Sequence, residues 1–477
     1  MSATRASHRP APTMRRLRRS LRPPACVAVA AAIVLAASNS VGHADRAGAL
    51  STTARACPTG LSGSWRCSTV AVPLDRSGAV GGGVQLAVAL FHRPGPPRPA
   101  VVALAGGPGS AAIPAALRFQ KRLGPLLKHR DLLVFDQRGT GVSAPIHCPT
   151  IDVRSAWTPA QVRQCAAHLG AGRAFQGTDD SVADLEDVRA ALGIPQLTVY
   201  GISYGTKVAV DYAREYPASV DRMVLDSPIV EDTDPYYRRS AIGAARVLRN
   251  QCAEGWCVRG VDPANDLRKL VARMRDGVLP ADPRITEARI LDTIVSGGNE
   301  LHRLPGRLHL ALDGYPRALA AALPTVVPDS RDASWLRPTR SRTVYLTTSC
   351  EDGDFPWPRS ARLWQRRADS DRELARLGDK SFAPFDRWVG RQYGAVPICA
   401  PWPESGRRPT PPPVPNVPTL LLVGGDDDIA PLEGAREIAS ELPRSRIVTI
   451  PAMGHGVLEN DPPAEAALAR WALRHPG

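Results

Sequence analysis

The stretch LTVYGISYG, residues 197–205, decides the fold of this chain. Its apolar start, Leu197–Tyr200, predicts a buried strand, and the Gly-x-Ser-x-Gly pattern places Ser203 between that strand and a helix expected over residues 204–216. The glycines permit a tight turn that lifts the serine hydroxyl above the edge of a sheet, beside the N–H groups that begin the helix. Ser203 is therefore a candidate nucleophile, and the alternative is a serine in an ordinary turn.

Strand-like and helix-like segments alternate on both sides of this turn. Several are continuous apolar runs, which suit strands buried on both faces of a parallel sheet. A helix over 181–192 has Ser181 as its expected cap and acidic residues in its first turns. The other expected elements are strands at 84–92, 100–104, 132–135, 222–225, 419–423 and 446–450, and a last helix near 464–473. The pattern predicts an α/β fold with a mostly parallel central sheet flanked by helices.

The alternation stops between residues 229 and 415. This segment is rich in arginine, contains tryptophans, has helix-like stretches such as 287–294 and 307–312, and ends in a proline run. An insertion that interrupts a sheet and returns to it is most simply a mainly helical lid over the site. The expected division of the chain is a signal peptide at 1–44, the first part of the core at 45–228, the lid at 229–415 and the C-terminal part of the core at 416–477.

The N-terminal segment predicts export. Arginines between Arg5 and Arg22 precede an apolar run from Ala25 to Ala37, and Gly42-His43-Ala44 is a small-residue cleavage site. The run is short for a membrane span, so we expect no stable span once the signal is removed, although an uncleaved anchor stays open. The net charge of +14 does not indicate nucleic-acid binding, because the basic residues are scattered and aromatics make up 5% of the chain.

The cysteines fit an exported protein with disulfides. Cys26 lies in the signal segment, and the remaining eight form an even set. Eight cysteines allow 105 connectivities, so pairing between sequence neighbours is favoured only by short loop closure. That pairing joins Cys57 to Cys67, Cys148 to Cys165, Cys252 to Cys257 and Cys350 to Cys399. No Cys/His spacing is that of a zinc site, and we expect no metal and no cofactor.

A serine nucleophile needs a base and an acid, which hydrolases with this elbow supply in the chain order Ser, Asp or Glu, His. His455, between two glycines after the strand at 446–450, is the candidate base. Three adjacent aspartates, Asp426–Asp428, follow the strand at 419–423, and their position alone leaves the choice of acid open.

The oxyanion of a tetrahedral intermediate also needs N–H donors. One is expected directly after the nucleophile, at Tyr204, and another in the loop after an early strand. The glycine-rich loop 105–109 follows the strand at 100–104, and Gly107 is the candidate donor there, with Gly106 in reserve. The alternative is a plain glycine-rich turn.

Four motifs together resemble one branch of a known family. The GGPG loop at 106–109, the DQRGTG segment at 136–141, the elbow around Ser203 and the GHG loop around His455 are similar to those of the proline iminopeptidase and tripeptidyl aminopeptidase branch of the α/β-hydrolases. The similarity covers most of residues 57–460. The branch places its acid four residues before a proline, in Asp-x-x-Thr-Pro. Pro431 therefore selects Asp427, although Ala430 stands where threonine is usual.

The resemblance implies an exported serine exopeptidase. Ser203, His455 and Asp427 would act through an acyl-enzyme on peptides with a free N-terminus. The rivals are a carboxylesterase or lipase on the same fold and, in another class, a catalytically silent binding protein. Arg138 is expected to be structural, with carboxylate or carbonyl partners. The sequence does not indicate an oligomeric state.

An aminopeptidase also needs a carboxylate for the substrate ammonium. Glu351 is the first candidate and Asp352 the second, because a bond between Cys350 and Cys399 would fix the backbone beside them. Glu231, Asp232 and Asp234, after the strand at 222–225, are further candidates. A carboxylate in a salt bridge or a solvated loop is the alternative for each.

Overall fold

The computed structural model describes residues 52–92, 98–151, 157–229, 233–257, 260–278, 282–323, 340–403, 413–459 and 461–474. The chain splits into the units Met1–Gly48 and Ala49–Gly477, and every described residue belongs to the second. The expected signal peptide and the candidates Glu231 and Asp232 lie outside the described residues. In the described ranges, no helix is both long enough and apolar enough to cross a bilayer.

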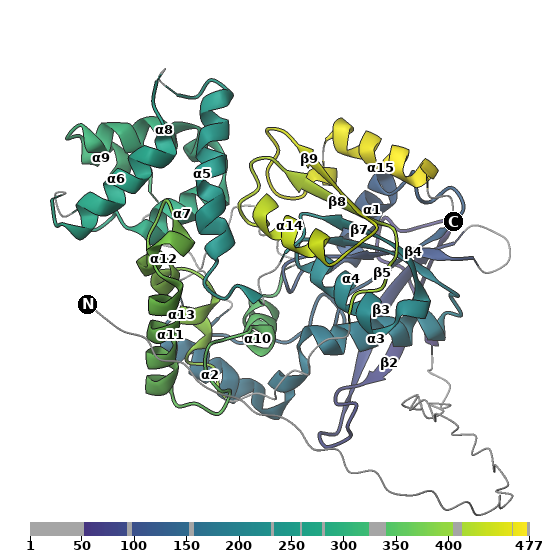
Figure 1. Ribbon diagram of the computed structural model, residues 1–477. Coiled ribbons are helices and arrows are strands. Elements are labelled where there is room, and N and C mark those ends of the chain that lie inside the picture. The colour runs from purple at the N-terminus through teal and green to yellow at the C-terminus, as the bar shows by residue number, and fades with distance from the viewer. Residues whose placement is uncertain are drawn as a thin grey trace, which may run out of the picture. The chain divides into compact units, whose positions relative to one another are not determined.

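The described residues form a nine-stranded mixed sheet in the order β1-β2-β3-β5-β4-β6-β7-β8-β9 (Figure 1). The strands are β1 Thr52–Arg55, β2 Trp65–Pro73, β3 Gly83–Phe91, β4 Ala100–Leu104, β5 Asp131–Phe135, β6 Leu197–Ile202, β7 Val220–Asp226, β8 Thr419–Gly424 and β9 Ser445–Ile450. Pairing is antiparallel from β1 to β5 through β2 and β3, and parallel from β5 to β9. The predicted mostly parallel α/β fold is confirmed.

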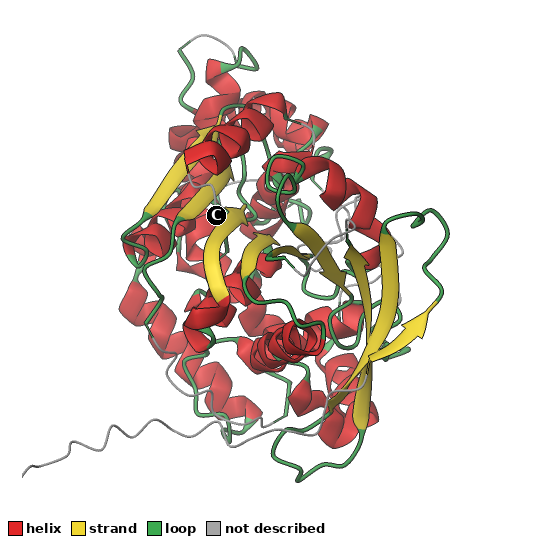
Figure 2. Cartoon of the chain, turned by 90° about the vertical axis from the view of Figure 1, so that its right-hand side faces the viewer, coloured by secondary structure: helices red, strands yellow, loops and turns green. Residues whose placement is uncertain are grey.

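The apolar runs explain the centre of this sheet. Every residue of β4, β5 and β8 is buried, as expected for parallel strands covered on both faces. Helices α3 Thr178–Ala191, α4 Tyr204–Glu215 and α14 Leu432–Ser440 contribute to the apolar core on one face. Helices α1 Ala116–Arg122 and α15 Pro462–Arg474 contribute to the core on the other, and Figure 2 shows helices on both sides of the strands.

The expectation that Ser181 caps its helix was wrong. Helix α3 begins at Thr178, and Ser181 lies buried inside its first turn, with its hydroxyl 3.4 Å from the carbonyl oxygen of Gly177. Gly177 takes the N-cap position with an extended backbone, and the Asp180 carboxylate accepts its N–H at 3.3 Å. Asp180, an acidic residue of the first turn, therefore caps the helix N-terminus from inside the helix.

The segment between β7 and β8 is helical, and its described part contains no strand. Its helices are α5 Arg238–Ala253, α6 Pro263–Arg275, α7 Glu287–Ser296, α8 Asn299–Leu312, α9 Pro316–Ala320, α10 Arg342–Asp352, α11 Leu363–Leu377, α12 Arg387–Gln392 and α13 Ala395–Cys399. We call this segment the helical region. Most of its helices share an apolar core distinct from the cores of the sheet, and Figure 1 shows them grouped beside it.

Four disulfides join the cysteines in the expected neighbour pairing. Cys57–Cys67 fastens the chain before β2 to that strand, and Cys148–Cys165 fastens the loop after β5 to α2 Pro159–Leu169. The other two lie in the helical region, where Cys252–Cys257 closes the end of α5 and Cys350–Cys399 links α10 to α13.

Candidate active site

Ser203 occupies a sharp turn between β6 and α4. Its φ of 54° lies in the left-handed region, where a non-glycine residue costs on the order of 1–3 kcal/mol. The turn is held from β7, because the Ser203 N–H donates to the carbonyl oxygen of Asp226 at 2.9 Å. A Cβ at position 205 would lie 2.3 Å from the Leu104 carbonyl oxygen, so only glycine permits this approach to β4. The strain presents the serine at the carboxyl edge of the parallel strands.

Asp427 and His455 meet at the same edge, after β8 and β9. The imidazole Nδ1 of His455 lies 3.0 Å and 3.2 Å from the two carboxylate oxygens of Asp427. The carboxylate also accepts the N–H groups of Ile429 at 3.0 Å and Ala430 at 2.9 Å. Burial alone would raise the pKa of Asp427, but His455 and the Ala430 N–H keep it below its usual value. Ala430, which stands where the resemblance led us to expect threonine, thus supports the Asp427 carboxylate through its main-chain N–H.

The neighbouring residues Asp426 and Asp428 form none of the described hydrogen bonds to His455. Asp426 accepts hydrogen bonds from Asn250 and Gln251 of α5, at 2.9 Å and 2.8 Å. Asp428 is buried, and neither carboxylate oxygen has a hydrogen-bond partner among the described residues. Burial raises the pKa of Asp428 well above its usual value. Of the three, Asp427 alone bonds to the histidine in the described contacts. The described residues also contain no group of three or more His, Cys, Asp or Glu side chains arranged to hold a metal ion.

Asp226 supports the histidine loop and was missed in the sequence. This buried residue at the end of β7 accepts the N–H groups of Val457 at 2.9 Å and Leu458 at 3.2 Å, and the hydroxyl of Tyr200 at 3.0 Å. The next residue, Ser227, accepts the N–H of Gly456 at 2.9 Å. The available signal was a carboxylate directly after the apolar run 223–225, at the same sheet edge as Ser203.

The glycine-rich loop after β4 approaches the serine closely. A Cβ at Gly106 would lie 2.9 Å from the Ser203 Cβ and 3.5 Å from its hydroxyl oxygen. Gly107 has a φ of 121°, which favours glycine. Arg340 donates to the carbonyl oxygens of Gly107 at 3.2 Å and Pro108 at 3.3 Å, so the far side of the loop is also held. The loop and Tyr204, the first residue of α4, thus flank Ser203.

A pocket opens beside these residues. Its lining includes Pro108 and Tyr204 from the core, and Thr348 and Asp352 from α10. The Asp352 carboxylate accepts the Thr178 N–H at 3.0 Å and the Thr178 hydroxyl, and the Thr178 hydroxyl oxygen lies 2.8 Å from the Tyr204 hydroxyl. Asp352 is therefore connected to the residue that follows Ser203.

Glu351 lies differently, although it is the adjacent residue. Its carboxylate accepts the indole N–H of Trp402 at 2.7 Å, and it is not among the residues that line the pocket. Asp234, the third described candidate, is buried and paired with Arg238 at 3.3 Å. Asp352 is therefore the predicted ammonium-binding residue that this pocket contains.

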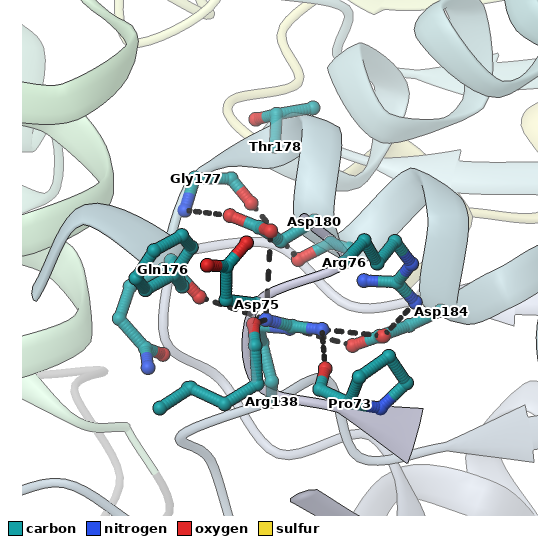
Figure 3. A network of polar contacts seen from close by, with 12 residues as sticks. Pro73, Asp75, Arg76, Arg138, Gln176, Gly177, Thr178, Asp180 and Asp184 are labelled. Atoms are coloured by element: carbon teal, nitrogen blue, oxygen red, sulfur yellow. Dashed lines mark hydrogen bonds and ion pairs between the residues drawn. The ribbon is translucent and has the colours of Figure 1, made fainter. Parts of the chain in front are cut away.

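Arg138 has the structural partners expected of it (Figure 3). Its guanidinium forms a two-point contact with Asp184 of α3 at 2.6 Å and 2.7 Å, and donates to the carbonyl oxygens of Leu74 and Phe175 at 3.0 Å and 2.9 Å. Figure 3 shows this side chain enclosed by the start of α3 and the end of β2. It fixes the helix whose first residue, Thr178, holds Asp352.

Comparisons with known proteins give one family and several relatives. The family model described as alpha/beta hydrolase fold matches residues 99–462. The chain is similar to Serine protease Hip1 of Mycobacterium tuberculosis, 28% identical over 445 residues, which cover 83% of each chain. It is also similar to Tripeptidyl aminopeptidase of Streptomyces lividans, 26% identical over 442 residues, which cover 82% of this chain and 78% of the relative. A shorter similarity, 35% identical over 129 residues, is to Probable proline iminopeptidase of Streptomyces coelicolor, covering 27% of this chain and 32% of that protein. The resemblance inferred from the motifs is confirmed.

Proposed function

Because this chain belongs to the α/β-hydrolase family, we propose that it is an exported serine exopeptidase that releases short peptides or single residues from a free N-terminus. The observation that carries the proposal is the bond between the buried Asp427 carboxylate and the His455 Nδ1, at the same sheet edge as the strained Ser203. The relatives named as a serine protease and aminopeptidases support peptide substrates.

The reaction would proceed through an acyl-enzyme. Ser203 Oγ attacks the peptide carbonyl carbon while His455 Nε2 accepts the hydroxyl proton, and the N–H groups of Tyr204 and Gly107 stabilise the oxyanion. His455 then returns the proton to the leaving amine, so that the C–N bond breaks. A water molecule, deprotonated by His455, attacks the ester and releases the N-terminal fragment. Asp427 keeps the proton on Nδ1 and stabilises the imidazolium.

The substrate ammonium is assigned to the pocket lined by Asp352. Asp352 lines this pocket, and Thr178 donates its N–H and its hydroxyl to the carboxylate, which fixes its position. A buried carboxylate lowers the cost of desolvating an ammonium group. Glu351, the first candidate from the sequence, would act indirectly, by fixing the end of α10 through Trp402.

The helical region, including residues 229–415, would serve as the lid. It supplies Asp352 and Thr348 to the pocket, and Arg340 lies next to the glycine-rich loop. Export through residues 1–44 is part of the same proposal, supported by the basic and apolar order of that segment and by the four disulfides.

The first test is labelling by a fluorophosphonate probe, which reacts with activated serines. The wild-type protein should label and Ser203→Ala should not, with unchanged circular dichroism. The second test compares matched peptides with free and N-acetylated termini. Only the free peptide should be cleaved, and equal cleavage of both would exclude an aminopeptidase. Faster turnover of short-chain esters, with neither peptide cleaved, would favour the carboxylesterase.

Asp352→Asn tests the ammonium pocket. We expect KM for free peptides to rise about tenfold, the size of one lost charge interaction, while kcat on a small neutral ester stays within about twofold. Glu351→Gln is the control on the adjacent residue, and it should affect the peptide much less. Equal losses on peptide and ester in Asp352→Asn would indicate that the residue only holds Thr178 and Tyr204 in place.

A further inference from the structure

The loop that carries Asp427 has two sides, held by different parts of the chain. On one side its N–H groups bond to the core, from Gly425 to the Ile450 carbonyl oxygen at 2.7 Å and from Asp426 to the Met453 carbonyl oxygen at 2.8 Å. On the other side, its carbonyl oxygens and the Asp426 carboxylate face α5 of the helical region.

Arg246 makes the most extensive of these contacts. Its guanidinium donates to the carbonyl oxygen of Gly425 and, at 3.2 Å, to that of Asp427 itself. The same group pairs with both carboxylate oxygens of Glu433 in α14 at 3.1 Å. A planar fork with several donors can bind two carbonyls and a carboxylate at once, which an ammonium group cannot reproduce.

Asn250 and Gln251 continue this contact one turn further along α5. The Asn250 amide donates to the Gly425 carbonyl oxygen at 3.0 Å and to Asp426 at 2.9 Å, and the Gln251 amide donates to Asp426 at 2.8 Å. Gln251 is fully buried, and its amide oxygen faces His302 Nδ1 at 2.6 Å, which fixes the orientation of the amide. Asp426 is therefore held from two adjacent side chains.

At Gly243, helix α5 lies so close to the Asp427 loop that no side chain fits between them. A Cβ at Gly243, in the same helix, would lie 2.3 Å from the Asp428 carboxylate and 3.1 Å from Pro431 Cβ. The contact between α5 and the acid loop thus consists of one close packing point and a row of hydrogen bonds, spread over two turns of helix.

We propose that Arg246, Asn250 and Gln251 are positioning residues that hold the Asp427 loop at hydrogen-bond distance from His455, so that the helical region assembles the triad as well as covering it. The inference rests on the proposed serine hydrolase function. A shift of about 1 Å in a catalytic group can cost about a hundredfold in rate. Loosening this contact should therefore reduce the rate of the chemical step and leave substrate binding unchanged.

Arg246→Lys is the decisive variant, because it keeps the positive charge and removes the planar guanidinium that binds several acceptors at once. We expect kcat and the rate of fluorophosphonate labelling to fall at least about tenfold, with KM within about twofold. The acid limb of the labelling profile should move to lower pH, because a displaced Asp427 carboxylate stabilises the protonated imidazole less. Asn250→Ala should show the same changes to a smaller degree, without altering any charge.

Arg239→Lys is the matched control. Arg239 lies on the same helix and pairs with Glu437 of α14 at 3.1 Å, but it makes none of the described bonds to the Asp427 loop. It should keep wild-type kcat and wild-type pH dependence. The proposal is overturned if Arg246→Lys and Asn250→Ala keep the wild-type acid limb and labelling rate, or if Arg239→Lys loses as much.

One readout needs no substrate. The Nδ1 proton of His455 bonded to Asp427 should give a low-field proton resonance that Asp427→Asn abolishes. We expect it to shift or broaden in Arg246→Lys and to persist in Arg239→Lys, and an unchanged resonance in Arg246→Lys would contradict the proposal. If the wild-type protein is labelled by the fluorophosphonate but cleaves no peptide, the exopeptidase function is wrong, whereas this inference still holds.

Discussion

At the scale of single residues, identical side chains acquire different chemistry from their surroundings. Asp426, Asp427 and Asp428 are consecutive, yet one faces amide donors, one faces an imidazole and one is buried with no described partner. The adjacent carboxylates of Glu351 and Asp352 also differ in their surroundings, since only Asp352 lines the pocket. The position of each carboxylate, and not its type, sets its role.

The three aspartates give a direct test. Asp427→Asn should lower kcat by about 10⁴, because an asparagine favours the wrong tautomer of His455. Asp426→Asn should lose about tenfold at most, through a weaker hold on the loop. Asp428→Asn should retain activity, since its carboxylate makes none of the described bonds to the histidine. Kinetics of the three purified variants on one substrate check the order, and a crippled Asp428→Asn would show that the acid is misassigned.

Asp226 should make folding stability depend on pH. Burial raises its pKa to about 6, against the lowering effects of the Leu458 N–H and the Tyr200 hydroxyl. A carboxyl group with a higher pKa in the folded state binds its proton more tightly there, so its contribution to stability is complete below about pH 4 and is lost as the pH rises through about 6. The free energy of unfolding of the wild type, relative to Asp226→Asn, should fall by about 3 kcal/mol between about pH 4 and about pH 7. Urea unfolding of both proteins measures it, and a difference that does not vary with pH would contradict the assignment.

At the scale of elements, the site depends on where helices begin and what holds their ends. Helix α3 presents Thr178 to Asp352, and Arg138 ties this end of the helix to β2 through Asp184 and the Leu74 carbonyl oxygen. Burial raises the pKa of Asp180, in the same turn, to about 6, although Arg138 acts to lower it. The network in Figure 3 therefore stabilises an element that the pocket needs.

Arg138→Met should destabilise the protein by about 3–5 kcal/mol, because the buried Asp184 carboxylate loses two hydrogen bonds and keeps the one from Arg76, while main-chain carbonyl oxygens lose the guanidinium donor. The control is Arg189→Met on the same helix. Arg189 pairs with Glu186 at a partly exposed site, and its loss should cost about 1 kcal/mol. Denaturant unfolding at neutral pH measures the free energy of unfolding of both variants. Equal losses would show that the buried network of Arg138 stabilises the protein no more than a partly exposed ion pair does.

At the scale of the whole described chain, the sheet has an apolar core on each face and the helical region has its own. The sheet and its helices carry Ser203, Asp427 and His455, whereas the helical region supplies Asp352 to the pocket and the contacts of α5 with the Asp427 loop. Cys350–Cys399 closes a separation of 49 residues within the helical region, and Cys252–Cys257 closes only 5.

Loop length predicts unequal effects of removing these two bonds. By chain entropy, replacing Cys350 and Cys399 with serine should cost about 4 kcal/mol, and replacing Cys252 and Cys257 about 2 kcal/mol. Thermal and urea unfolding under non-reducing conditions compare the two double variants. A larger loss from the shorter loop would mean that packing around α5, rather than loop entropy, sets the stability of the helical region.

The sequence by itself determined the elements whose causes are local. The buried strand β4 is apolar along its whole length, and Ser203 is marked by the two glycines of its turn. The chain order of serine, aspartate and histidine follows from strand succession. Ser181 was misplaced because the capping contact that begins α3 comes from Asp180, inside the helix.

Only the tertiary structure decided which polar groups meet across long separations. Asp226 bonds to Val457, and Arg246 bonds to the carbonyl of Asp427, through contacts that no local pattern encodes. The orientation of α10 likewise places Asp352 beside Thr178 and Glu351 beside Trp402. A hydrogen bond depends on distance and angle in space, and these are fixed by the packing of the sheet against the helical region rather than by neighbours in the chain.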